Sequence, residues 1–274
     1  MIIDSHQHFW KYIPERDTWI DETMEVLRRD FFPEDLAPIL KANQVSGCIA
    51  VQADQSEGET EFLLSCAAAH PFIKGVVGWV DLCASNLDER LAFFSKNSLF
   101  KGVRHIVQAE KEDFLLRKEV QRGIGKLSKY NLTYDLLVFP HQLPAAVNLV
   151  KQFPEQKFVL DHLAKPAISE PISKTWLTQI ARLSENQNVF CKFSGMVTET
   201  KGYQFEADDF TPFLDVIFEH FGPDRILFGS DWPVCLLAAE YKNVLRLVMN
   251  YLDAHGQSVK DKVLGENAIA FYNL

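Results

Sequence analysis

The sequence lacks any long apolar run. Hydrophobic residues make up 47% of its 274 positions, yet no segment approaches the about 18 consecutive apolar residues that a membrane-spanning helix needs. Basic residues are also few, with 28 Lys and Arg against 37 Asp and Glu and a net charge of −9. Nucleic acids and anionic membrane surfaces are bound by basic patches, and here the basic residues are scattered. We therefore expect neither nucleic acid nor a membrane as a partner.

Cysteine is scarce as well. The five cysteines are odd in number, show no C-x-x-C spacing and mostly lie in apolar stretches, which is typical of small core residues in a reducing compartment. The first residues show no basic segment followed by a long apolar run, the pattern of a secretory signal. We expect a cytoplasmic protein.

Short apolar runs recur along the whole chain, and there are eight of them. Between them lie segments with apolar residues at spacings of three and four, for example residues 57–70, 114–131 and 143–153, which indicate amphipathic helices. The eight runs cover residues 1–6, 47–53, 75–81, 102–108, 133–139, 158–164, 189–195 and 226–232.

This alternation of strand and helix predicts a parallel sheet with helices as crossovers. Eight such units are typical of a single (β/α)8 TIM barrel, and α/β barrels commonly occupy this length as one domain. A doubly wound open sheet is the alternative. No linker, low-complexity segment or block of like charge divides the chain. We therefore predict one domain over residues 1–274, in a monomer or a homodimer.

Polar residues stand at the C-terminal ends of these runs, which is where TIM-barrel enzymes place their chemistry. His6 ends the first run and His8 follows two residues later, and on a strand alternate side chains share one face. Ionisable groups at the ends of apolar strands cost desolvation unless they are paired or used. The other residues at the C-terminal ends of the runs are Arg104, Asp135, Asp161, His162, Lys192, Ser194, Asp231 and Trp232.

Each of these residues also has a purely structural interpretation. The two histidines would then only bond backbone groups at a strand end, and His162 would be a satisfied core histidine. Asp231 would cap a following helix, a common role for Asp. Arg104 and Lys192 would form ion pairs with the buried carboxylates. The residues alone leave both interpretations open.

Several segments together resemble the amidohydrolase-2 family of TIM-barrel hydrolases. They are "DSHQHFW", "KGVRHIVQ", "DHLAKP", "KFSGMVTE", "ILFGSDWPV" and the closing "GENAIAFY", which span almost the whole chain. The sequence is most similar to the sugar-lactonase branch, which includes L-fuconolactonase-like and L-rhamnonolactonase-like proteins and is related to 2-pyrone-4,6-dicarboxylate lactonase. The motifs are specific for the family but not for the substrate.

The resemblance implies hydrolysis of a sugar-acid γ-lactone to the open acid. Asp231 would activate water as general base, and His6, His8 and His162 would surround the lactone carbonyl or a divalent metal. Sugar hydroxyls need fixed donors and acceptors, and two indoles offer apolar ring faces. The expected substrate-binding residues are Arg104, Lys165, Lys192, Glu199, Trp10 and Trp232, with Glu199 implied by the resemblance alone.

The sequence departs from the metal-rich members of the family in two places. No lysine ends the fourth run, and the fifth run contains no histidine, so a binuclear centre is not expected. His6, His8, His162 and Asp231 form a four-ligand N/O set suited to one Zn²⁺ or a similar ion. The alternative is a site without metal, as the resemblance to the pyrone lactonase implies.

Two further functional classes stay open at the level of the sequence. Relatives on the same barrel are nonhydrolytic decarboxylases of aromatic acids, which need cations to hold a carboxylate, and Arg104 and Lys192 supply two. The second class is a catalytically silent barrel that binds a sugar acid, because a fold alone does not establish turnover.

Overall fold

Every predicted apolar run overlaps one β-strand in the computed structural model, which describes residues 1–274. The strands are short and almost completely buried, as expected for runs rich in β-branched residues that are covered on both faces. They are β1 (Ile3–Gln7), β2 (Gly47–Val51), β3 (Ile73–Gly78), β4 (Phe100–Ile106), β5 (Thr133–Leu137), β6 (Phe158–Leu160), β7 (Val189–Phe193) and β8 (Ile226–Phe228).

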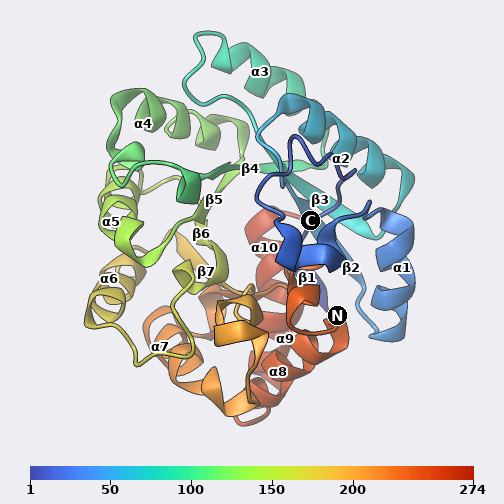
Figure 1. The fold of residues 1–274 in the computed structure, drawn as a ribbon. Coiled ribbons are helices and arrows are strands. Elements are labelled where there is room, and N and C mark those ends of the chain that lie inside the picture. Colours follow the sequence, from blue (N-terminus) through green and yellow to red (C-terminus); the bar gives the residue numbers. More distant parts are fainter.

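The strands form one parallel sheet in the order β1 to β8, and the sheet curls into a barrel (Figure 1). A parallel bridge between Gln7 and Trp232 joins the first strand to the segment that follows the last one. Two backbone hydrogen bonds reinforce this junction, from His8 N to Trp232 O at 2.7 Å and from Asp231 N to His6 O at 2.8 Å. The structure therefore confirms the TIM barrel and not the open sheet.

The helices surround the barrel as an outer ring, except that the last one lies behind its centre in Figure 1. None of them is long and apolar enough to cross a lipid bilayer. They are α1 (Pro33–Ala42), α2 (Glu57–Ala69), α3 (Leu87–Phe94), α4 (Lys118–Ile124), α5 (Leu143–Gln152), α6 (Lys174–Ser184), α7 (Thr211–Phe221), α8 (Tyr241–Asp253), α9 (Gln257–Asp261) and α10 (Asn267–Tyr272).

Helix ends follow ordinary local signals. Pro33 opens α1, where its missing N–H is no loss, and the Ser56 hydroxyl caps α2 by accepting from the Glu59 backbone N–H. The amphipathic segment 114–131 is less regular than its pattern indicates: a helix of seven residues, α4, lies between two short 3₁₀ turns. Within α4 only glycine fits at position 123, because a Cβ there would lie 2.2 Å from the Leu82 carbonyl oxygen.

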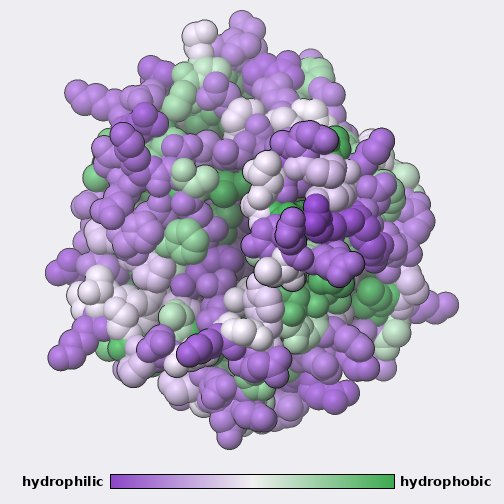
Figure 2. All heavy atoms as spheres, viewed as in Figure 1, coloured by the Kyte–Doolittle hydropathy of each residue, from purple (hydrophilic) through white to green (hydrophobic).

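The barrel interior changes character along its axis. At the N-terminal end apolar side chains of the strands, such as Ile49 and Leu227, pack against Phe271 and Tyr272 of α10. Charged side chains occupy the next layer toward the C-terminal end, among them the fully buried Lys192. Outside the barrel, the main apolar core fills the space between strands and helices. Hydrophilic residues dominate the face seen in Figure 2, with hydrophobic ones in scattered groups.

Candidate active site

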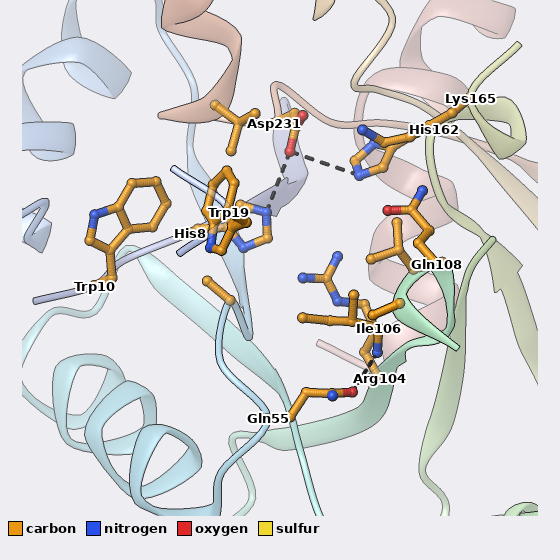
Figure 3. A pocket seen from close by; sticks show the side chains of 14 residues that line it. His8, Trp10, Trp19, Gln55, Arg104, Ile106, Gln108, His162, Lys165 and Asp231 are labelled. Carbon is orange, nitrogen blue, oxygen red and sulfur yellow. Dashed lines mark hydrogen bonds and ion pairs between the residues drawn. The ribbon is translucent and has the colours of Figure 1, made fainter. Parts of the chain in front are cut away.

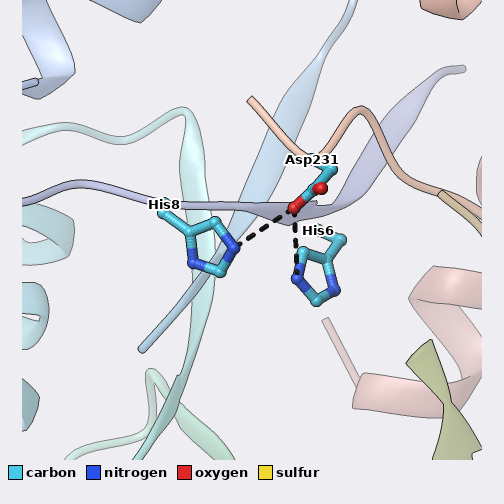
Figure 4. A group of neighbouring side chains, drawn as sticks. All are labelled: His6, His8 and Asp231. Carbon is cyan, nitrogen blue, oxygen red and sulfur yellow. Dashed lines mark ion pairs between the residues drawn. The ribbon is translucent and has the colours of Figure 1, made fainter. Parts of the chain in front are cut away.

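Three histidines and one aspartate meet at the C-terminal mouth of the barrel. Asp231, just beyond β8, has its Oδ1 atom 3.4 Å from His8 Nε2, 3.8 Å from His162 Nε2 and 3.9 Å from His6 Nε2. Figure 4 shows the two histidines of the first strand directed at this carboxylate. The closing junction between β1 and β8 explains the proximity, because it pairs the backbone of Asp231 with that of His6.

The imidazoles are held with their Nε2 atoms toward Asp231. His8 Nδ1 donates to the Val51 carbonyl at 2.7 Å, so its Nε2 carries the lone pair when the ring is neutral. His162 Nδ1 pairs with the Ser194 hydroxyl at 2.9 Å. Burial lowers the pKa of His162 to about 4 and that of His6 well below its ordinary value. At neutral pH these two rings are therefore uncharged, the form that binds metals and accepts protons.

His162 owes its position to an unusual backbone. Four consecutive residues from His162 to Lys165 have positive φ angles between 50° and 60°, a left-handed turn that costs about 1–2 kcal/mol per residue for L-amino acids. Tertiary contacts hold the turn: Trp176 Nε1 donates to the Leu163 carbonyl at 2.8 Å. At Gly195 a Cβ would lie 2.3 Å from the His162 ring, so only glycine fits there. Such strain is often concentrated at functional sites.

Asp231 does not cap a helix, which removes the structural interpretation of this residue. Its only close partners are the imidazole nitrogens, and its Oδ2 atom is buried without any hydrogen-bond partner. Burial by itself would raise the pKa of this carboxyl, but the three histidines, His162 foremost, hold the pKa well below its usual range. The group is an ionised carboxylate at neutral pH.

A layer of buried ion pairs lies beneath these residues. Lys192 Nζ lies 2.5 Å from Asp135 Oδ2 and 2.9 Å from Asp161 Oδ1, and Arg104 Nη1 lies 3.3 Å from Asp161 Oδ2. Together with Asp231, this layer contains three carboxylates and only two cations. Asp231 itself has no Lys or Arg partner. Asp231 is therefore the one carboxylate of the three whose negative charge no Lys or Arg compensates.

The donor set therefore fits a divalent cation. His6, His8 and Asp231 offer ligand atoms within 4.8 Å of one another, and imidazole with carboxylate is a donor combination that zinc and similar ions prefer. A second group, His6, Asp161 and His162, satisfies the same distance. The oxygens of Asp161 are already paired with Lys192 and Arg104, so the group around Asp231 is the better candidate.

Asp4 is a buried residue of this site that the sequence patterns did not single out. Its carboxylate accepts hydrogen bonds from Ser230 N at 2.9 Å, the Ser230 hydroxyl at 2.6 Å and the Tyr241 hydroxyl at 3.1 Å. Burial raises the pKa of Asp4 to about 6, although these donors lower it. The contacts fasten the segment that carries Asp231 onto β1. The available signal was an acid inside the apolar run 1–6.

A pocket of about 310 Å³ opens directly above the histidines (Figure 3). Of the residues expected to bind substrate, Arg104, Lys165 and Trp10 line it. Glu199 does not line it but lies 2.9 Å from Lys165 Nζ and so orients that side chain. The lining consists of His8, Trp10, Trp19, Ala53, Gln55, Arg104, Ile106, Gln108, Ala109, Leu137, His162, Lys165, Asp231 and Val234.

Besides Glu199, two other residues that were expected to bind substrate need correction. Lys192 is fully buried one layer below the pocket. There its ammonium group forms ion pairs with Asp135 and Asp161. Trp232 is 1% exposed and packs edge-to-face against Phe9 and Phe31. Neither residue lines the pocket, so Lys192 is an ion-pair residue, as its structural interpretation held, and Trp232 belongs to the core.

Other pocket residues could not be singled out from the sequence because they lie in loops. Trp19 is 44% exposed and packs against Trp10 with ring centroids 6.0 Å apart, which extends an aromatic wall toward solvent. Gln55 follows β2, and its Oε1 accepts from the Ile106 backbone N–H at 2.8 Å. Gln108 follows β4. The only signal for the two glutamines was their place just after a strand.

Comparison with known proteins gives a consistent result over the full chain. The amidohydrolase family model matches residues 3–274. An L-fucono-1,5-lactonase of Burkholderia multivorans is 38% identical, with 99% of this chain and 96% of that protein aligned, and an L-fucono-1,5-lactonase of Burkholderia ambifaria is 32% identical over 99% and 95%. A solved zinc-bound amidohydrolase of Burkholderia multivorans superimposes with a TM-score of 0.96, at 37% identity over 100% and 99% of the two chains. The chain thus belongs to the amidohydrolase family.

Proposed function

We propose that this enzyme hydrolyses the lactone of a sugar acid, with L-fucono-1,5-lactone as the first substrate to test. One observation carries the proposal: three imidazoles converge on an ionised, buried carboxylate at the base of a pocket. Such a site suits the addition of water to a carbonyl carbon. The names of the two curated relatives support a lactone as substrate.

The residues of the chain account for the proton movements of this reaction. Asp231 accepts a proton from water as its oxygen bonds to the lactone carbonyl carbon, and the carbonyl oxygen becomes an oxyanion. The positive charge of Arg104, whose side chain lines the pocket, stabilises the oxyanion through space and without a direct hydrogen bond. When the bond from this carbon to the ring oxygen breaks, the protonated Asp231 returns its proton to the leaving alkoxide. The product is the open hydroxy acid.

We propose that one divalent ion, Zn²⁺ or a similar metal, is held by His6, His8, His162 and Asp231. When bound, such an ion supplies Lewis acidity that polarises a carbonyl and lowers the pKa of water. The uncompensated charge and unpaired oxygen of Asp231 support this assignment, and the similar solved amidohydrolase holds zinc.

The ring size is a finer part of the proposal. The resemblance of the sequence implies a five-membered γ-lactone, whereas the two curated relatives described above are named for a six-membered 1,5-lactone. The decarboxylase alternative is less favoured by the structure. It needs cations free to hold a carboxylate, and Lys192 is fully engaged by two aspartates while Arg104 is paired with Asp161.

A pH-indicator assay over a panel of lactones tests the function. The panel contains sugar 1,5-lactones and γ-lactones, the unsubstituted δ-valerolactone, pyrone and aryl lactones, and aromatic acids for decarboxylation. We expect proton release with sugar-acid lactones, fastest with L-fucono-1,5-lactone. Turnover of an aromatic acid without proton release would support the decarboxylase instead, and no turnover of any compound would favour the silent binding barrel.

Metal content provides a separate prediction. Because three imidazoles and one carboxylate converge but no second set of free ligands is present, elemental analysis of untagged protein should find about one divalent ion per chain. Removal of this ion by a chelator should lower lactone turnover, and added Zn²⁺ should restore it. A stoichiometry near two would contradict the mononuclear site, and a metal-free protein with full activity would contradict the metal altogether.

A further inference from the structure

Two hydrogen-bond donors in the wall of the pocket have no partner within the chain. They are Nε of Arg104 and Nε2 of Gln108, and both atoms are buried. Both side chains line the pocket, one from the end of β4 and the other from the segment after it. Since more than about 90% of buried polar groups in folded proteins are hydrogen-bonded, a pair of unpaired donors in one pocket wall indicates a ligand that supplies the acceptors.

The rest of the Arg104 guanidinium is already engaged. Its Nη1 atom lies 3.3 Å from both His6 Nε2 and Asp161 Oδ2. Its Nη2 atom donates to the backbone and side-chain carbonyls of Gln52. The side chain is only 3% exposed, so these contacts fix its orientation. Nε is the donor that remains for a substrate.

The wall that carries Gln108 is held in place as well. Gln55 Oε1 accepts from the Ile106 backbone N–H at 2.8 Å, which ties the segment after β2 to the end of β4. Figure 3 shows Gln108 and Arg104 on the side of the pocket away from Trp10. The pocket therefore has a polar wall with unpaired donors and an aromatic wall formed by Trp10 and Trp19.

A sugar lactone matches these two walls. Its hydroxyl oxygens are acceptors, while the carbon–hydrogen face of its ring is apolar and packs on aromatic rings. We infer that Gln108 Nε2 and Arg104 Nε donate hydrogen bonds to hydroxyl oxygens of the substrate, and that Gln108 selects polyhydroxylated lactones over unsubstituted ones. This inference rests on the proposed function and names the specificity-determining wall of the same site.

The size of the expected selection follows from what a missing partner does to buried donors. A site built to hydrogen-bond a substrate hydroxyl disfavours an analogue that lacks it, because the donors of the site then stay unpaired in the complex. Loss of one such neutral hydrogen bond lowers the affinity about tenfold. The preference for a sugar lactone over δ-valerolactone should therefore fall about tenfold when the Gln108 amide is removed.

The variant Gln108→Met tests this inference, because methionine keeps the length of the side chain and removes the donor. We measure kcat/KM for L-fucono-1,5-lactone and for δ-valerolactone. If δ-valerolactone turns over too slowly, its inhibition constant against the sugar lactone is measured in place of its kcat/KM. The ratio of the two should fall about tenfold. The thermal midpoint of the free protein should stay unchanged or rise, since the lost Nε2 has no partner in the chain.

The control is Gln152→Met, on the exposed end of α5, which should change neither the ratio nor the thermal midpoint. An unchanged ratio in Gln108→Met would overturn the inference. Equal losses for both lactones together with a lower thermal midpoint would also overturn it, because they indicate a structural role. A wild-type protein that acts on no lactone contradicts the proposed function itself, and this is established before any variant is compared.

Discussion

Replacement of Asp231 by Asn is expected to lower kcat on the best lactone substrate by about 10²–10⁴, the usual contribution of a positioned general base. Asparagine keeps the shape of the side chain but cannot accept the proton of the attacking water. The carboxylate is ionised and lies 3.4–3.9 Å from three imidazole nitrogens at the base of the pocket. No other carboxylate lines the pocket.

The substitution of Asp231 by Asn should leave the fold unchanged. Asp231 has a φ angle of 58°, a left-handed conformation that asparagine also adopts readily, and its side chain caps no helix. The thermal midpoint should therefore change little. We measure kcat at saturating Zn²⁺, together with bound metal, so that loss of the base is separated from loss of an ion. Asp224→Asn, on the exposed surface, is the control, and near-normal turnover of Asp231→Asn would place the base elsewhere.

The barrel could be predicted from the sequence because its strands carry a strong and repeated signal. Each run is apolar enough to be buried on both faces, and eight runs alternate with amphipathic segments. Pairing order follows from this, because consecutive parallel strands joined by helices lie side by side. The two 3₁₀ turns beside α4 could not be predicted, because the amphipathic pattern runs without interruption over residues 114–131.

The grouping of His6, His8, His162 and Asp231 followed from their shared place at strand ends. It needed no knowledge of side-chain conformation, because barrel closure alone brings the first and last strands together. The depth of a residue within the barrel was harder to predict from the sequence. Lys192 and Arg104 both lie within their strands, yet Lys192 is buried in the layer below the pocket and Arg104 lines the pocket. Sequence position cannot separate these two layers when they are only two residues apart.

Residues in loops were the least predictable part of the site. Trp19 reaches the pocket from the long connection between β1 and α1, and Gln108 from a short turn after β4. No periodicity constrains such segments. The buried Asp17 shapes the loop that carries Trp19. Its carboxylate accepts a hydrogen bond from the Ile13 backbone N–H at 2.8 Å. Contacts of this kind are set by the folded structure and leave no pattern in the sequence.

Replacement of Lys192 by Met should destabilise the protein strongly. The ammonium group is fully buried and lies 2.5 Å from Asp135 Oδ2 and 2.9 Å from Asp161 Oδ1. Removing one partner of a buried ion pair leaves an uncompensated charge and costs about 3–5 kcal/mol. For a domain of this size the thermal midpoint should fall by roughly 6–20 °C.

The loss should also depend on pH, because Asp135 is left without its cation. Burial raises the pKa of Asp135 to about 6 even beside Lys192, and removal of the cation raises it further. A carboxyl whose pKa is higher in the folded than in the unfolded protein loses stability as pH rises from the unfolded value through the folded one. The difference in thermal midpoint between wild type and Lys192→Met should therefore be larger at pH 8 than at pH 5.

Two further variants test whether the buried charge is the cause. Lys262→Met removes a lysine whose ion pair with Asp224 is on the surface, where such pairs contribute about 0–1 kcal/mol, so its thermal midpoint should barely change. The double variant Lys192→Met/Asp135→Leu removes both charges and should recover part of the loss, because an apolar pair needs no compensation. A Lys192→Met protein as stable as wild type at pH 8 would contradict the prediction. Recovery in the double variant would identify Lys192 as the cation that keeps Asp135 ionised beneath the site.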